Sequence, residues 1–208
     1  MNNPIREIFT GAAFYTLATL FARALVLLVI PIYTAVLTPF EYGVMGMLDV
    51  AVLVGVKLVG LGLYGAQTRR LYDRQGKEDD GSDFAHFAFS ANCLLFIGWL
   101  IFGLSLWTTW PYLQDVLQQR DIELGVQHAW VVFAVVGLLS FKEMAFSYFS
   151  AVRNYLKASS MIGLESVAFL VLVYVFLYRF DLGVLGKYMA QGVGSACLVA
   201  VFFIPYLW

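Results

Sequence analysis

The sequence predicts an all-α, polytopic membrane protein that crosses the bilayer as a bundle of six transmembrane helices. The first observation is compositional: 61% of the 208 residues are hydrophobic, 13% are charged, and the mean hydropathy is +0.79. Soluble domains carry about 25% charged residues, so a water-soluble enzyme, a disordered chain and a disulfide framework are all excluded. The second observation is the length of the uncharged runs at 84–114 and 188–208, because one span needs about 20 apolar residues.

Six hydrophobic stretches follow one another without a linker, so residues 1–208 are expected to form a single six-helix transmembrane lobe. The first stretch is too long for a secretory signal peptide and is interrupted by Arg23. From these stretches we expect helices at about 9–37, 40–67, 84–109, 126–151, 159–178 and 183–206.

A turn signal separates the first two helices. Thr38 suits a helix N-cap, Pro39 occupies the first helical position, and Glu41 follows three residues after Thr38. This is the capping-box pattern with proline where a backbone N–H is not needed. It predicts a sharp turn and the start of the second helix, which contains only the charged residues Asp49 and Lys57.

The other four helices are equally poor in charge. The third and the sixth come from the two uncharged runs, with Lys187 near the outer end of the sixth. The fourth contains the adjacent pair Lys142 and Glu143, and the fifth contains only Glu165. Residues 111–124 between the third and fourth helices leave room for a short surface helix.

The orientation follows from the lysines and arginines of the connections, which favour the cytoplasmic side. With a cytoplasmic N-terminus, seven of them lie inside and two, Arg120 and Arg179, lie outside. We therefore expect both termini to be cytoplasmic. The seven inside residues are Arg6, Arg69, Arg70, Arg74, Lys77, Arg153 and Lys157.

Several other chemistries find no support in the sequence. Gly60-Leu61-Gly62-Leu63-Tyr64-Gly65 matches a dinucleotide-binding fingerprint but lacks the strand that such a site needs. We interpret its glycines as allowing close helix packing. Two histidines and two dispersed cysteines cannot assemble a metal site, and no catalytic triad is visible, so no cofactor is expected. The net charge of −1 offers no basic face for nucleic acid.

The charged residues inside the spans are the candidate functional residues. Each costs about 2.5–3.5 kcal/mol near the bilayer centre on insertion scales, so such residues face a wet cavity, form pairs or reach an interface. We favour a polar cavity for the set, with structural ion pairs such as Arg23 with Asp49 as the alternative. The seven residues are Arg23, Asp49, Lys57, Lys142, Glu143, Glu165 and Lys187.

Two expectations concern individual members of this set. Lys142 and Glu143 are neighbours that point about 100° apart on a helix, so they are not expected to pair face to face. Glu165 and Lys187 lie near helix ends, where both can reach lipid headgroups.

The chain resembles the N-terminal half of the Wzx-like polysaccharide flippases, a branch of the multidrug/oligosaccharidyl-lipid/polysaccharide (MOP, MATE-like) exporter superfamily. Four stretches carry the likeness, and the first is the specific one. They are Leu37-Thr38-Pro39-Phe40-Glu41-Tyr42-Gly43, Thr68-Arg69-Arg70-Leu71-Tyr72-Asp73, the basic loop 153–159, and Leu182-Gly183-Val184-Leu185-Gly186.

The resemblance implies a multi-pass protein of the bacterial inner membrane with two six-helix lobes around a central cavity. This chain would supply one lobe, as a truncated fragment, as half of a pair of copies, or with a separate C-terminal partner. The absence of a soluble tail after residues 204–207 favours truncation.

The function implied is that of a flippase, not an enzyme. It would move undecaprenyl-diphosphate-linked oligosaccharides to the outer leaflet by alternating access, for O-antigen, capsule or exopolysaccharide assembly, alongside the polysaccharide polymerase machinery. The expected substrate-binding residues are Arg23, Lys57, Lys142 and Lys187, and the expected ion-coupling residues are Asp49, Glu143 and Glu165.

Three alternatives stay open at this point. One is a multidrug or organic-cation antiporter of the same superfamily, which would show an acid-dominated cavity. Another is a membrane-embedded enzyme using the acidic cluster Glu78-Asp79-Asp80, which we interpret as a solvated loop. The third is a non-transporting subunit of polysaccharide assembly.

Overall fold

The computed structural model describes residues 4–74, 82–118, 125–152 and 154–203, and every regular element in these ranges is helical. Six of the helices are long and apolar enough to cross a membrane, which confirms the predicted all-α bundle. The loop that contains Glu78-Asp79-Asp80, together with Lys77, Arg120 and Arg153, lies outside the described residues. The orientation in the membrane therefore stays a prediction.

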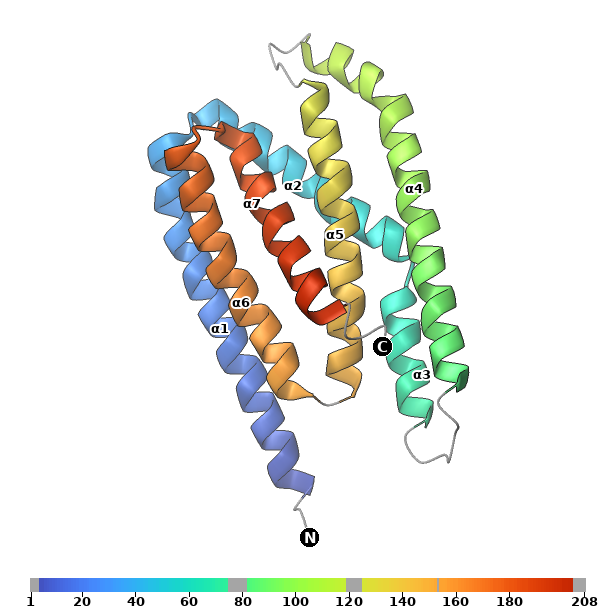
Figure 1. The fold of residues 1–208 in the computed structure, drawn as a ribbon. Coiled ribbons are helices and arrows are strands. Elements are labelled where there is room, and N and C mark those ends of the chain that lie inside the picture. Colours follow the sequence, from blue (N-terminus) through green and yellow to red (C-terminus); the bar gives the residue numbers. More distant parts are fainter. Residues whose placement is uncertain (1–3, 75–81, 119–124, 153, 204–208) are drawn as a thin grey trace.

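The described residues form seven α-helices, which Figure 1 labels α1 to α7. Two of them, α6 and α7, continue into a single π-helical turn at Val175–Arg179 and Val199–Phe203. The α-helices are α1 (Pro4–Val36), α2 (Pro39–Gly60), α3 (Leu63–Arg74), α4 (Ser82–Gln118), α5 (Val126–Ala151), α6 (Tyr155–Tyr174) and α7 (Gly183–Leu198).

The predicted turn between the first two helices is confirmed in detail. Thr38 is the N-cap of α2, and its hydroxyl oxygen accepts a hydrogen bond from the Glu41 backbone N–H at 3.3 Å. In return, a Glu41 carboxylate oxygen accepts from the Thr38 backbone N–H at 2.8 Å. Because the two groups satisfy each other's exposed donors, this pair fixes where α2 begins.

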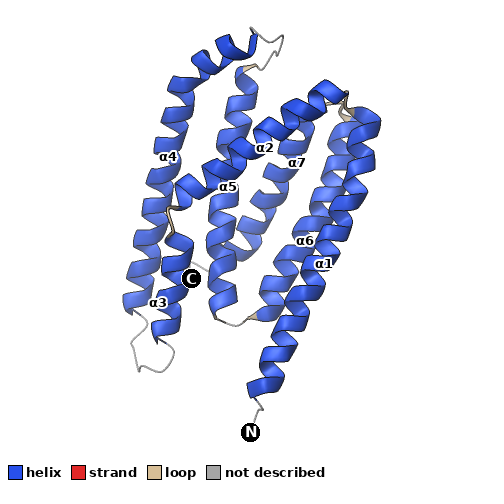
Figure 2. Ribbon diagram, turned by 180° about the vertical axis from the view of Figure 1, so that it is seen from behind, coloured by secondary structure: helices blue, strands red, loops and turns tan. Residues whose placement is uncertain are grey.

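The predicted second helix, 40–67, is wrong as a continuous element. The structure breaks it between α2 and α3, and Figure 2 shows the break as a short loop. Leu61 and Gly62 have φ values of 40° and 80°, a left-handed conformation that ends a helix. Gly60 leaves room for Tyr64, whose ring lies 2.4 Å from where a Cβ at residue 60 would stand. The glycine motif therefore forms a helix break.

Two other predicted boundaries differ from the structure. The third predicted helix ends at 109, but α4 continues to Gln118, so part of the expected surface helix is the end of α4. Pro111 lies inside α4, which bends near its end in Figure 1, because proline removes one helical hydrogen bond. The fifth predicted helix begins at 159, but α6 begins at Tyr155, where the Asn154 side chain caps it.

The centre of the bundle is α5, which packs against α2, α3, α4, α6 and α7. By contrast, α1 lies along α6, as both views show, and reaches α5 through a hydrogen bond between the Tyr15 and Ser150 hydroxyls. Against α4, α5 makes a tight aromatic contact: Trp99 stacks on Phe133 with ring centroids 4.5 Å apart and donates its indole N–H to the Phe133 carbonyl at 2.8 Å. Gly137 provides the space for this indole.

Gly137→Ala is expected to destabilise the protein by about 1–3 kcal/mol, because overpacking a close contact forces neighbours to shift. A Cβ at residue 137 would lie 2.5 Å from the Trp99 ring. The matched control is Gly163→Ala on α6, where a Cβ meets nothing within 4 Å and alanine favours the helix. Thermal unfolding of both variants in detergent checks this. Equal melting temperatures for the two variants would contradict it.

Candidate functional site

Asp49 of α2 and Lys187 of α7 form one of two ion clusters among the described residues. The Lys187 ammonium hydrogen-bonds to both carboxylate oxygens of Asp49. It also lies 5.9 Å and 5.1 Å from the ring centroids of Tyr33 and Tyr188, within cation–π range. The Tyr188 hydroxyl donates to the Met45 carbonyl at 2.7 Å and to Asp49 at 2.9 Å. This arrangement joins α1, α2 and α7.

The structure places Lys187 differently from the expectation that it reaches lipid headgroups. Its side chain is only 9% exposed, whereas that of Asp49 is 46% exposed. Asp49 is therefore paired with Lys187, and not with Arg23 as in the ion-pair alternative. The reason is tertiary: α7 packs against α2 and brings residues 138 positions apart into contact.

The second cluster, which we call the charged cluster, consists of Lys142, Glu143 and Glu165. The Lys142 ammonium donates to a Glu165 carboxylate oxygen at 2.6 Å and lies 3.6 Å from a Glu143 carboxylate oxygen. The side chains are 10%, 40% and 32% exposed for Lys142, Glu143 and Glu165. One lysine and two glutamates give the charged cluster a formal net charge of −1.

This geometry corrects two expectations. Lys142 and Glu143 do lie within salt-bridge distance, because the flexible lysine side chain crosses the angle between two neighbouring helix positions. Glu165 does not extend away to the headgroups but bonds to Lys142 of the adjacent helix. The sequence alone does not show that α5 and α6 face each other at this level.

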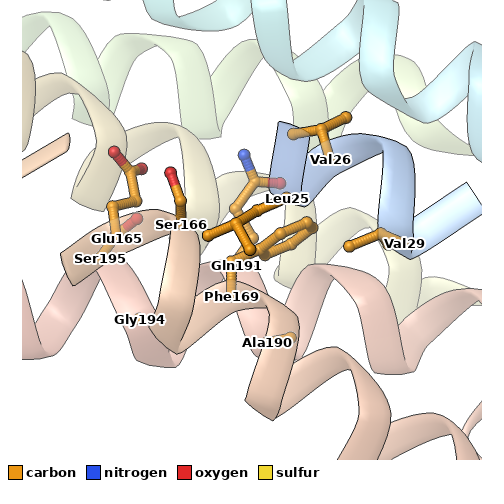
Figure 3. A pocket seen from close by; sticks show the side chains of 10 residues that line it. All are labelled: Leu25, Val26, Val29, Glu165, Ser166, Phe169, Ala190, Gln191, Gly194 and Ser195. Atoms are coloured by element: carbon orange, nitrogen blue, oxygen red, sulfur yellow. The ribbon is translucent and has the colours of Figure 1, made fainter. Parts of the chain in front are cut away.

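A pocket of about 180 Å³ lies beside the cluster, between α1, α6 and α7. Figure 3 shows its polar groups, Glu165, Ser166 and Ser195, at one end and apolar side chains such as Val26 and Val29 at the other. The Ser195 hydroxyl is buried and makes no hydrogen bond with any described residue. A smaller cavity of about 70 Å³, lined by all three cluster residues, lies between α5 and α6. Glu165 therefore borders two cavities.

Arg23 of α1 and Lys57 of α2 are not part of either cluster. Both side chains lie on exposed faces of their helices. Neither makes an ion pair or a hydrogen bond with a residue in the described part of the chain. The seven predicted residues thus divide into five that the fold brings together and two cations without a partner there.

Reasoning from charge missed the neutral polar residues of this region. Gln191 and Ser195 line the pocket, and they follow Lys187 at intervals of four residues on α7. Residues four apart share one face of a helix. That spacing was the available signal, because it marks one polar stripe on an otherwise apolar helix.

Six apolar helices that hold charged groups between them define a multi-pass helical membrane protein. Its fold is similar to the crystal structure of a MATE mutant, with a TM-score of 0.61 and 20% sequence identity. The match covers 94% of this chain and 43% of the MATE chain, so this chain spans less than half of that length. This likeness shows the fold.

No known family model and no curated protein matches the sequence.

Proposed function

We propose that the chain is one lobe of a MOP-type transporter that moves a lipid-linked oligosaccharide with a diphosphate headgroup, such as an undecaprenyl-diphosphate carrier, across a bacterial inner membrane. The fold supports a transporter of this superfamily. The observation that carries the substrate class is the pair of cations, Arg23 and Lys57, without a partner among the described residues.

An anionic substrate explains why these two charges are kept in membrane-spanning helices. Asp49 is paired with Lys187, and Glu143 and Glu165 lie beside Lys142, so the carboxylates of the two clusters are not paired with Arg23 or Lys57. A charge near the bilayer centre is costly unless a partner or water compensates it. A diphosphate supplies that compensation, and the planar fork of arginine suits phosphate oxygens.

Their ion pairs divide the four predicted substrate-binding cations into two groups. Lys142 and Lys187 are largely buried and held by carboxylates of the protein itself. We assign them to the internal clusters and assign headgroup binding to Arg23 and Lys57. Ion coupling is assigned to Glu143 and Glu165, which share a single lysine beside a pocket.

Arg23→Gln and Lys57→Gln are each expected to reduce transport at least about tenfold, the effect of losing roughly 1.4 kcal/mol of charge-assisted binding. Membrane insertion and melting temperature are expected to stay unchanged, because neither side chain packs against a described partner. The measurement is flipping of a fluorescent polyprenyl-diphosphate oligosaccharide in proteoliposomes. Arg179→Gln, in the π-helical turn that follows α6, is the control. Wild-type flipping in both variants would refute the assignment.

An organic-cation antiporter is the second candidate, and the charged cluster favours it. Two acids against one lysine, next to a mostly apolar pocket, can attract a hydrophobic cation. Binding of a cationic dye that is lost in Glu165→Gln, with no binding of polyprenyl diphosphate, would establish this candidate over the first.

The second lobe is part of this proposal. The matched MATE chain is more than twice as long, and an alternating-access cavity lies between two halves that rock against each other. We therefore expect a second six-helix unit to face the exposed sides of α1 and α2, which carry Arg23 and Lys57. The polymerase machinery of polysaccharide assembly is a further proposed partner.

A further inference from the structure

An apolar groove of about 260 Å³ lies between α4 and α5 and shares no lining residue with either ion cluster. Its walls include Leu104 and Trp107 of α4 and Trp130 of α5, whose side chains are all more than half exposed. None of the described residues that line it is charged. Both helices span the membrane, and α4 lies at the edge of the bundle opposite α1 in Figure 1. We therefore expect lipid, and not the second lobe, to lie against this groove.

The floor of the groove is fixed by close packing. Phe133 stacks on Trp99 with ring centroids 4.5 Å apart. Gly103 lets the Phe133 ring lie against α4, since a Cβ at residue 103 would be 2.3 Å from it. The Trp130 ring packs edge-on against Phe133 at 6.2 Å and lies 5.6 Å from the Trp107 ring. Because these side chains hold one another, the groove is formed before a ligand binds, which lowers the cost of binding.

The lining determines what can fill the groove. An apolar cavity does not hold water, and one of about 150 Å³ is large enough for benzene. A groove of about 260 Å³ therefore has room for a longer segment of hydrocarbon. Tryptophan is enriched at the membrane–water interface, so Trp107 and Trp130 place one end of the groove at the depth of lipid headgroups. The acyl chain of a phospholipid fits this chemistry and this depth.

The same end of the groove has a backbone hydrogen-bond acceptor. Pro111 lies one turn after Trp107 in α4 and has no N–H, so the Trp107 carbonyl lacks the donor that the helix would otherwise supply. Helix carbonyls point toward the C-terminus, which places this acceptor beyond the aromatic end of the groove. A primary ammonium headgroup can donate a hydrogen bond to it, whereas the quaternary nitrogen of choline has no N–H.

We propose that this groove binds one molecule of phosphatidylethanolamine. One acyl chain lies between α4 and α5 and covers the exposed parts of both indole rings. The ammonium group of the headgroup donates a hydrogen bond to the Trp107 carbonyl. The inference does not depend on the proposed function, since the groove shares no residue with the clusters or with Arg23 and Lys57.

The experiment measures binding of the first lipid to the delipidated 208-residue chain in detergent, by native mass spectrometry. Phosphatidylethanolamine and phosphatidylcholine with identical acyl chains are compared, so that only the headgroup differs. We expect phosphatidylethanolamine to bind about threefold to tenfold more tightly, the range for one hydrogen bond. Equal affinities, no binding of either lipid, or tighter binding of phosphatidylcholine through cation–π contact with the indoles overturns the proposal.

Three variants test the two parts of the site. Ala129→Leu fills the groove and is expected to weaken binding of both lipids severalfold, whereas Ala35→Leu, on an exposed face of α1, leaves both unchanged. Trp130→Ala removes a wall without adding volume and is expected to act like Ala129→Leu, so the site stays testable if Ala129→Leu does not fold.

Pro111→Ala returns an N–H to α4. It is expected to abolish the preference for phosphatidylethanolamine without changing the affinity for phosphatidylcholine. Equal weakening of both lipids by Pro111→Ala would mean that the bend of α4 matters and the carbonyl does not, which overturns the proposal. Unchanged binding in folded Ala129→Leu and Trp130→Ala variants overturns it as well.

Discussion

Asp49→Ala is expected to destabilise the protein by about 3 kcal/mol, because it leaves the buried Lys187 ammonium without its counterion. Lys187 is 9% exposed, and both carboxylate oxygens of Asp49 bond to it. The Tyr188 hydroxyl also loses one of its two acceptors. Thermal unfolding in detergent and the yield of folded protein measure this effect.

The double variant Asp49→Ala with Lys187→Met is the decisive comparison. Removing both charges leaves no uncompensated ion, and methionine keeps most of the lysine volume, so we expect recovery of most of the lost stability. The control is Lys57→Met, which removes an exposed lysine without a described partner and is expected to change stability by less than about 0.5 kcal/mol. A double variant as unstable as Asp49→Ala would show that the carboxylate acts through something other than Lys187.

Lys142→Met is expected to destabilise the protein by about 1–3 kcal/mol, because two partly exposed carboxylates then remain next to each other without a cation. Glu165→Gln is expected to cost less, since Lys142 still has Glu143 at 3.6 Å. The order of melting temperatures follows as wild type, then Glu165→Gln, then Lys142→Met. Combining Lys142→Met with Glu165→Gln is expected to raise the melting temperature above that of Lys142→Met alone.

The difference in stability between Glu165→Gln and Lys142→Met tests whether Lys142 interacts with both acids of the charged cluster. If Glu165→Gln proves as damaging as Lys142→Met, then Glu143 does not accept the Lys142 ammonium when residue 165 is neutral. The measurement is the same unfolding experiment, at one pH for all the variants of the series.

The start of α2 is a structure that neighbouring residues alone predict. Thr38, Pro39 and Glu41 form a cap by interacting with each other, so their spacing predicts the turn and the structure confirms it. The break after Gly60 was missed because the same glycines also suit close helix packing. Only the backbone conformation of Leu61 and Gly62 distinguishes the two interpretations.

The candidate site divides in a similar way. The free-energy cost of a charged side chain in the bilayer identified all seven charged residues as candidates. Five of them lie in the two ion clusters. Their partners were not predictable, because Lys187 and Asp49 are 138 positions apart and Lys142 and Glu165 are 23 apart. Ser195 and Gln191 are neutral and carry no such free-energy cost, so a search for charged residues did not identify them.

By itself, the sequence determined that this chain is a bundle of membrane helices, where most of them lie, and which side chains are too costly in lipid to be incidental. These properties depend on hydrophobicity and on neighbours within a few residues. The tertiary structure decided which cations are neutralised and which remain available, as Lys187 and Arg23 illustrate. The physical reason is that the free energy of a charge in a membrane depends on what lies within a few ångströms of it, and the packing of helices sets the distances between residues far apart in sequence.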